Sequence, residues 1–286
     1  MSTFAIALVL LSATFHATWN LMAKRAKGGP VFLWLFAVVS FIIYTPITLI
    51  FVLINQPVIG PSQVLFMVIS AFLHLAYFLL LSQGYRVGDL SLVYPLARGT
   101  GPMLSVVGAI LLLGEHPSTV ALIGAALIGL GIFALTGDPR KLRQHNALPG
   151  VIFALLTGVT IAAYTLSDKY AVATILVAPV VLDWGSNTGR ILLLTPVALR
   201  RWDEVRDQWR DYRKEVIFVA VLSPLAYIMV LFAMSFSPVS YVAPMREIST
   251  LIGTFMGVRL LSEGHLRRRL GAASIMALGV IALGLG

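Results

Sequence analysis

Apolar residues fill ten stretches of the chain, each close to the roughly 20 residues that a helix needs to cross a lipid bilayer. Polar and charged residues gather between these stretches. Long continuous apolar runs favour helices, because a membrane-spanning barrel shows short segments of alternating polarity instead. The pattern predicts an all-α integral membrane protein with ten transmembrane helices, at residues 2–22, 31–54, 63–85, 91–113, 118–136, 148–168, 176–199, 215–235, 240–261 and 269–286.

The overall composition agrees with this pattern. Hydrophobic residues make up 58% of the chain and charged residues 12%, proportions that would leave a soluble domain with large exposed apolar patches. The chain has no cysteine, which excludes a disulfide framework and a thiolate metal site. The sequence also lacks a phosphate-binding Walker A loop and any other enzyme signature. We therefore expect neither enzymatic activity nor a cofactor or bound metal.

The basic residues are distributed unevenly between the two sides of the predicted bundle. Of the 21 Lys and Arg, 16 lie in alternate connections between the predicted helices, which all fall on the same side of the membrane. By the positive-inside rule these connections are cytoplasmic, which places both termini outside the cell and the protein in the plasma (inner) membrane. The net charge of +9 reflects this asymmetry, so we expect no nucleic-acid partner. The 16 residues are Lys24, Arg25, Lys27, Arg86, Arg140, Lys141, Arg143, Arg200, Arg201, Arg206, Arg210, Arg213, Lys214, Arg267, Arg268 and Arg269.

The longest basic connection, RRWDEVRDQWRDYRK, mixes charges with apolar residues at helical spacing. Trp202, Val205, Trp209 and Tyr212 recur every three or four residues, which predicts an amphipathic helix at the cytoplasmic interface of the membrane. A solvated charged loop is the alternative.

The two halves of the chain resemble each other. The sequence LLSATFHATWNLMAKRA matches LLTGVTIAAYTLSDKYA, and VYPLARG matches VAPMRE. Arg98 precedes Glu115 by seventeen residues, and Arg246 precedes Glu263 by the same interval. The sequence therefore predicts two five-helix repeats, at 1–137 and 148–286, joined by a cytoplasmic connector at 138–147. Five is odd, so the repeats are inverted; shared composition alone is the alternative explanation.

Each half also ends in a pattern that resembles a known family. The segments LGEHPSTVALIGAALIGLGIFAL and LSEGHLRRRLGAASIMALGVIAL resemble the repeat ending of EamA-type transporters in the drug/metabolite transporter superfamily. The resemblance implies a ten-helix carrier of small metabolites, often an amino acid exporter, and HATWNLMAKRA is similar to a subset found near phosphonate-utilisation genes. Bacterial exporters of that family are usually drawn with cytoplasmic termini, whereas the basic residues here favour external ones.

Two arginines lie inside predicted transmembrane helices, where a charge is costly and is functional by default. Arg98 and Arg246 occupy matching places in the two halves, with Glu247 beside the second. A guanidinium offers planar, bidentate hydrogen bonds to a carboxylate or phosphate. We expect these three residues to bind substrate. The alternative is a structural role for each arginine, paired with an acid such as Asp168, Asp183 or Glu247.

Other polar residues within the predicted helices complete the candidate site. His16, Trp19, Asn20, His74, Tyr77 and Tyr227 are expected to form an aromatic, hydrogen-bonding wall of the substrate cavity. Each histidine alone favours an ordinary buried residue, and only the set as a whole favours a cavity. Asp183 and Glu247 are the candidates for proton coupling, although Asp183 could instead pair with an arginine. Glu115 and Glu263 are expected to cap helices or join them.

Prolines fall within several of the predicted helices and are expected to interrupt them, most informatively at Pro95 and Pro244 beside the two arginines. The others are Pro102, Pro179, Pro196 and Pro224.

Together these features predict a secondary transporter that moves an amino acid or another carboxylate-bearing metabolite by alternating access, with export as the expected direction. Its partners are the small-molecule substrate, the lipid bilayer and a coupled proton; the chain is a monomer or a homodimer. One alternative is a carrier of phosphate- or phosphonate-bearing metabolites. A second is a component of a lipid-linked sugar flippase.

Overall fold

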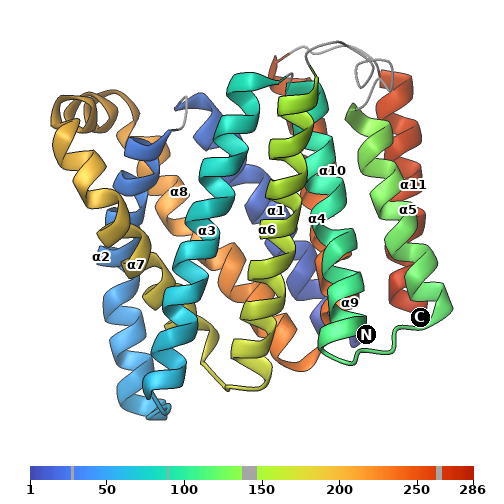
Figure 1. The fold of residues 1–286 in the computed structure, drawn as a ribbon, viewed down its shortest axis with the longest axis horizontal. Helices are drawn as coiled ribbons and strands as arrows, with labels where there is room; N and C mark the ends of the chain where they lie inside the picture. The colour runs from blue at the N-terminus through green and yellow to red at the C-terminus, as the bar shows by residue number, and fades with distance from the viewer. Residues whose placement is uncertain (27–28, 89, 137–146, 262–265) are drawn as a thin grey trace.

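The computed structural model describes residues 1–26, 29–88, 90–136, 147–261 and 266–286, and all regular structure in these ranges is helical (Figure 1). Each of the ten predicted ranges overlaps helical structure. The helices are α1 (Thr3–Arg25), α2 (Pro30–Asn55), α3 (Pro61–Val87), α4 (Leu90–Leu112), α5 (Thr119–Thr136), α6 (Leu148–Ala173), α7 (Pro179–Arg200), α8 (Trp202–Phe236), α9 (Val239–Arg246), α10 (Ile248–Leu261) and α11 (Leu266–Leu285).

Several of these helices have the length and apolar composition of membrane spans. Within the described ranges, six contain such a stretch, namely α1, α2, α3, α4, α6 and α8, and α5 and α11 contain shorter apolar stretches. Their outward surfaces carry many exposed Leu, Ile, Val and Phe side chains, which in water would form a large apolar patch. The protein is a multi-pass membrane protein.

One predicted helix differs from its predicted form. The predicted helix at 240–261 is divided, because α9 ends at Arg246 and α10 begins at Ile248. Pro244 has no N–H for the carbonyl four residues earlier. The N–H of Glu247 bonds instead to the Pro244 carbonyl at 3.0 Å, and the N–H of Thr250 bonds to the Glu247 carbonyl at 2.9 Å. Hydrogen bonds to the carbonyl three residues earlier, as in a 3₁₀-helix, tighten the turn and separate the two α-helices.

The predicted amphipathic segment is helical, which confirms that part of the prediction. It forms the first turns of α8 and bends at Tyr212, whose φ of −128° and ψ of 24° are not helical. Val205 is buried, while the side chains of Trp202 and Trp209 are exposed. Its location at the membrane interface stays a prediction.

The prolines interrupt the helices less than the sequence suggests. Pro179 is the first residue of α7, and Pro196 and Pro224 lie within continuous helices. α4 also continues through Pro95 and Pro102. The expected break beside Arg98 is therefore wrong, and only the segment around Arg246 is divided. A proline removes one backbone bond, which neighbouring packing can compensate.

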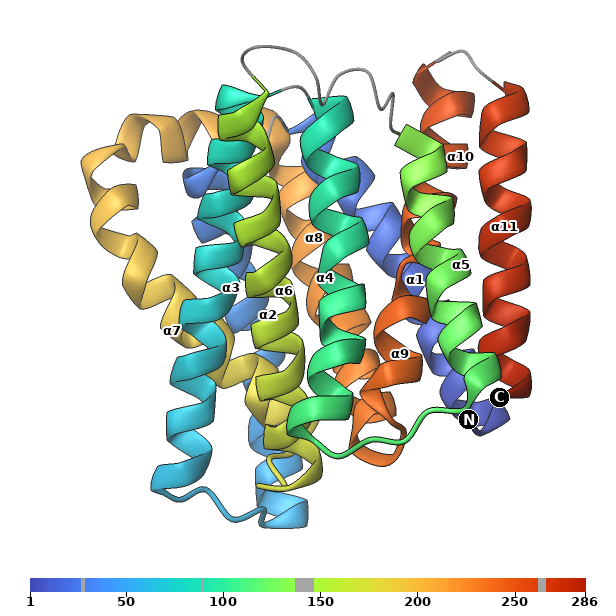
Figure 2. The same cartoon turned by 45° about the vertical axis from the view of Figure 1, so that its right-hand side comes forward.

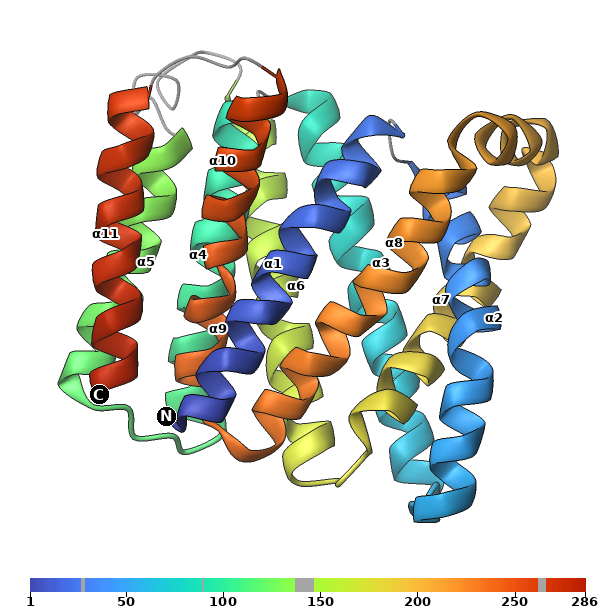
Figure 3. The same ribbon diagram turned by 180° about the vertical axis from the view of Figure 1, so that it is seen from behind.

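The helices are arranged as an elongated bundle. α2 and α7 pack together at one end and α5 and α11 at the other, with the remaining helices between them (Figures 1 and 2). In the centre α1 packs on α8, α3 on α6, and α4 on α9, and α1 and α8 cover the rear face (Figure 3). Each of these named contacts has a counterpart when the helices of the first predicted repeat are exchanged for those of the second. The α1–α8 contact, for example, becomes α6–α3.

Small residues allow the outer pair α5 and α11 to approach closely. A Cβ added to Gly124 would lie 2.7 Å from the carbonyl oxygen of Gly279, and one added to Gly279 would lie 2.7 Å from that of Gly124. Glycines at such crossings let two backbones touch in a membrane, where lipid tails supply no hydrophobic driving force between helices.

Both termini lie at the same end of the bundle along the direction of the helix axes, at the bottom of Figure 2. The helix ends that carry Lys24, Arg25, Arg86 and Arg200 lie at the opposite end. The arrangement therefore agrees with the predicted segregation of basic residues. Apart from Ala147, the predicted connector at 138–147 lies outside the described residues, as do Lys27 and Glu263.

Candidate functional site

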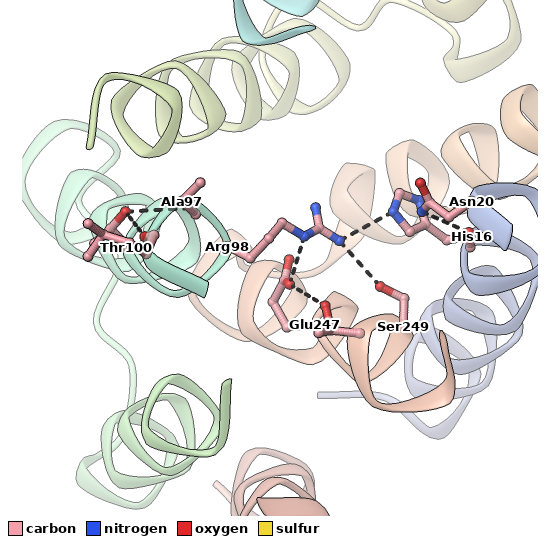
Figure 4. Close-up of polar contacts among 9 residues, drawn as sticks. His16, Asn20, Ala97, Arg98, Thr100, Glu247 and Ser249 are labelled. Atoms are coloured by element: carbon pink, nitrogen blue, oxygen red, sulfur yellow. Dashed lines mark hydrogen bonds and ion pairs between the residues drawn. The ribbon is translucent and has the colours of Figure 1, made fainter. Parts of the chain in front are cut away.

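Arg98 reaches from α4 across the centre of the bundle toward the break between α9 and α10 (Figure 4). Its Nε lies 3.3 Å from Oε2 of Glu247, and both side chains are at least 93% buried. Its Nη2 lies 3.3 Å from Nε2 of His16 on α1 and donates to Oγ of Ser249 on α10 at 3.5 Å. Because a guanidinium can only donate, His16 accepts through Nε2 and carries its proton on Nδ1.

The contacts of Arg98 leave hydrogen-bonding capacity unused. Although Nε is within ion-pair distance of Glu247, its N–H is not aligned for a hydrogen bond and has no other partner. Arg98 as a whole residue is only 6% exposed. Burying a guanidinium with an unsatisfied N–H is unfavourable. An additional acceptor, such as a ligand carboxylate, would complete its coordination.

Glu247 occupies the single position between α9 and α10. Its Oε2 also accepts a hydrogen bond of 3.2 Å from Oγ1 of Thr250. The ion pair therefore joins a helix of the first half to the divided segment of the second. A charge at a helix break can move with less disturbance of backbone bonds than one inside a continuous helix.

A small cavity lies beside this ion pair. Its volume is about 10 Å³, close to the minimum that holds one water molecule. Arg98, Arg246 and Glu247 contribute to its lining together with Ser12, Ala13, His16 and Ser249. The arginine predicted from each half thus faces the same space, together with a carboxylate and an imidazole.

A second polar cluster adjoins Arg246. The guanidinium of Arg246 lies over the ring of Tyr227, 5.5 Å from its centroid, a cation–π geometry. The Tyr227 hydroxyl donates to Oδ2 of Asp168 on α6, and Oγ of Ser70 on α3 donates to the same oxygen at 3.2 Å. Asp168 is fully buried.

Aromatic rings enclose this cluster. His74 stacks on Tyr164 with centroids 4.3 Å apart and meets Tyr227 edge to face at 5.1 Å. Tyr77 meets the Tyr164 ring edge to face, with the centroids 5.9 Å apart. The Nδ1 atom of His74 is 2.8 Å from the Ser70 carbonyl, which fixes the imidazole as a donor on that side.

The predicted site residues therefore fall into separate groups. Arg98, Arg246, Glu247 and His16 line the cavity, while His74, Tyr77 and Tyr227 belong to the adjoining aromatic cluster. Trp19 contacts the His16 ring edge to face at 4.9 Å, and Asn20 is exposed and donates to the His16 carbonyl. Neither side chain lines the cavity.

Asp183 lies elsewhere in the bundle. It is 4% exposed on α7, and Arg190 of the same helix is the charged group with the strongest influence on it. Asn187 of the same helix donates to the Ala37 carbonyl on α2 at 2.9 Å. Asp183 does not line the cavity, and its expected role in proton coupling stays a prediction.

Glu115 acts as a cap, as expected. Its two carboxylate oxygens accept the backbone N–H groups of Val239 and Ser240 at 2.7 and 2.9 Å, at the start of α9. A carboxylate at a helix N-terminus satisfies free donors and complements the helix dipole.

The sequence did not select Ser249, Ser70, Tyr164 or Asp168 as site residues. Asp168 carried a usable signal, since a carboxylate inside an apolar span is itself unusual. The serines and Tyr164 have no such signal, because short hydroxyl side chains and tyrosines are common in transmembrane helices and only the packing reveals their partners.

Comparison with known proteins agrees with this architecture. The model of the EamA-like transporter family matches residues 3–137 and 148–285. No curated protein matches the sequence. A solved structure described as "Crystal structure of protein" is 15% identical, covers 98% of each chain and superposes with a TM-score of 0.76, which shows a shared fold. Because the family model covers both halves almost completely, the chain belongs to the EamA-like transporter family and is a transporter of the drug/metabolite type.

Proposed function

We propose that the protein is a secondary transporter of a small polar metabolite that bears a carboxylate. The observation that carries this proposal is the shared cavity, to which Arg98 comes from the first half and Arg246 from the second. Guanidinium groups bind carboxylates through parallel, charge-assisted hydrogen bonds. The unsatisfied Nε–H of Arg98 supplies a donor for such a ligand.

The charges of the cavity favour an amino acid over a doubly charged anion. Two guanidinium groups and one carboxylate line it, which leaves a net charge of +1 when all three are ionised. A zwitterionic amino acid matches the arrangement of these charges, because its carboxylate can bind the guanidinium groups while its ammonium group binds Glu247. A phosphate or phosphonate would bring a second negative charge against Glu247, so we rank such substrates second.

The cavity in this conformation is too small for a metabolite. A volume of about 10 Å³ holds about one water molecule, so substrate entry requires the lining helices to separate. The break at Glu247 supports movement of α9 and α10 relative to α1 and α4, because the backbone ladder is already interrupted there.

Alternating access follows from the proposed inverted repeats, 1–137 and 148–286. The exchange of helix contacts between the halves, such as α1–α8 for α6–α3, supports a two-fold relation. A site at the interface of such repeats opens to each side in turn as one unit rocks against the other. Because the family is often described as exporting amino acids, export is the proposed direction of transport.

A ligand screen on the purified protein tests the proposed substrate class. Thermal unfolding is measured with amino acids, organic acids, phosphorylated metabolites and a lipid-linked sugar, since a ligand stabilises the fold that binds it. An amino acid should raise the melting temperature of the wild type but not that of Arg98→Lys, which keeps the charge and loses the planar donor pair. Arg86→Lys, at the exposed end of α3, is the matched control. Stabilisation by the lipid-linked sugar alone would favour the flippase alternative.

The proposed orientation in the plasma (inner) membrane, with both termini external, has its own test. The basic residues at one end of the bundle support it. An impermeant label applied to intact cells should reach a tag fused after Gly286. Protection of the tag, with labelling only after lysis, would reverse the orientation.

A further inference from the structure

Asp168 is a buried carboxylate with incomplete coordination. Its Oδ2 atom accepts from Ser70 and Tyr227, whereas Oδ1 is buried and has no hydrogen-bond partner. Among the described residues, no lysine or arginine lies within ion-pair distance of it. A carboxylate that is fully buried without a cation is unfavourable unless it is protonated or neutralised from nearby.

The ionisable groups around Asp168 come from several helices. α3 contributes His74, which contacts Tyr227 of α8, and α4 carries Arg98, which pairs with Glu247. Lys169 is next in sequence, but its Nζ donates to the carbonyls at the end of α8. The groups in electrostatic range are Tyr227, Arg246, Asp183 and Arg190.

Tyr227 connects this carboxylate to the cavity. Its hydroxyl donates to Asp168, while its ring lies beneath the Arg246 guanidinium. Arg246 in turn lines the cavity with Arg98 and Glu247. A change of charge on Asp168 therefore alters the electrostatic environment of Arg246 in the proposed substrate site, and Tyr227 is the one side chain between them.

We propose that Asp168 is the proton-binding residue of the transport cycle and that Tyr227 links its charge to Arg246. This inference rests on the proposed function and differs from the sequence-based candidates. Glu247 is paired with Arg98, and Asp183 is not among the residues that line the cavity. A proton taken up from water forms an O–H bond on Oδ1, so the side chain becomes neutral, and the same proton is released from Oδ1 later in the cycle.

The linkage determines which species move together. When Asp168 is neutral, Arg246 loses a compensating negative charge and binds a carboxylate more tightly. Proton and anion then favour each other's binding and cross in the same direction. An inward proton gradient would consequently drive uptake, and export would require an outward substrate gradient larger than the opposing proton gradient.

Infrared difference spectroscopy of the purified protein tests the proton site without any substrate. Spectra recorded at a series of pH values should show the carbonyl stretch of a buried protonated carboxylic acid. Asp168→Asn should abolish this band. Asp183→Asn, the matched control on α7, should keep it and change at most the pH at which it appears, because Asp183 lies in electrostatic range of Asp168. Persistence of the full band in Asp168→Asn would overturn the proposal.

Milder variants provide a readout if Asp168→Asn does not fold. Tyr227→Phe removes one donor to the carboxyl group and should shift the frequency of the band, and Arg246→Gln should change the pH at which it appears. No change in either variant would contradict the link to the cavity. Because none of these spectra requires a ligand, a failed substrate screen would count against the proposed function and leave this result intact.

Discussion

α4 and the α9–α10 segment carry matching motifs, VYPLARG and VAPMRE, but have different backbones. α4 is continuous from Leu90 to Leu112, whereas the second segment is divided at Glu247. Each has a proline two or three residues before its arginine. The local sequence alone therefore does not decide whether the helix breaks.

The neighbouring helices differ at these two places. A Cβ added to Gly101 of α4 would lie 2.6 Å from Cγ2 of Ile161 on α6, and one added to Gly158 would lie 2.2 Å from Oγ1 of Thr100. Gly253 of α10 has its nearest neighbour, Cβ of Ala17, at 3.9 Å. Tight packing along α6 thus supports a continuous α4, which holds Arg98. In the divided segment, which supplies Glu247, α9 is also buried, and extra room is found only farther along, at Gly253 of α10.

The largest effect is expected from Arg98→Ala, which removes the ion-pair partner of Glu247 and leaves this buried carboxylate without its salt bridge. Breaking such a pair costs about 3–5 kcal/mol, so thermal unfolding in detergent should shift markedly and transport in membrane vesicles should be abolished. The double variant Arg98→Ala/Glu247→Ala should recover part of the stability without transport. Parental transport by either variant would show that Arg98 is structural only.

A smaller effect is expected from Gly101→Ala, which tests the tight side of the comparison. The new methyl group would overlap the Ile161 side chain, and overpacking of this kind costs about 1–3 kcal/mol. The melting temperature should fall, and Gly101→Ala/Ile161→Val should recover part of the loss. An unchanged melting temperature would show that α4 and α6 adjust freely.

Glu115→Ala tests how the divided segment is anchored at its start. The substitution removes both acceptors from the backbone N–H groups of Val239 and Ser240, and loss of a helix cap costs about 0.5–2 kcal/mol. Hydrogen exchange at the start of α9 should accelerate, and Glu115→Gln should have an intermediate effect because one oxygen remains. Equal exchange in all three proteins would refute the capping role.

The smallest effect is expected from Gly253→Ala on the loose side. Its methyl group has ordinary van der Waals room beside Ala17, and alanine is favoured over glycine in a helix by up to about 1 kcal/mol. Melting temperature should stay the same or rise slightly, in contrast to Gly101→Ala. A fall as large as that of Gly101→Ala would remove the proposed difference in packing.

Much of the fold follows from local patterns. Apolar runs located helical structure in all ten predicted ranges, and the spacing of Trp202, Val205 and Trp209 identified the amphipathic turns. Arg98, Arg246 and Glu247 were identifiable because charges inside apolar spans are rare. The sequence predicted a helix break beside both arginines, and the structure has one only beside Arg246. A proline weakens a helix, but the packing of neighbouring helices determines whether the helix divides.

The sequence by itself determined an apolar, helical, two-part transporter with an arginine at corresponding places in each part. Only the tertiary structure decided that Arg98 pairs with a carboxylate 149 positions away and that Asp168, Ser70 and Tyr227 meet. Hydropathy reports whether a residue suits lipid, a property of each short segment. Which buried polar groups satisfy one another depends on how helices from both parts pack, and no short segment contains that information.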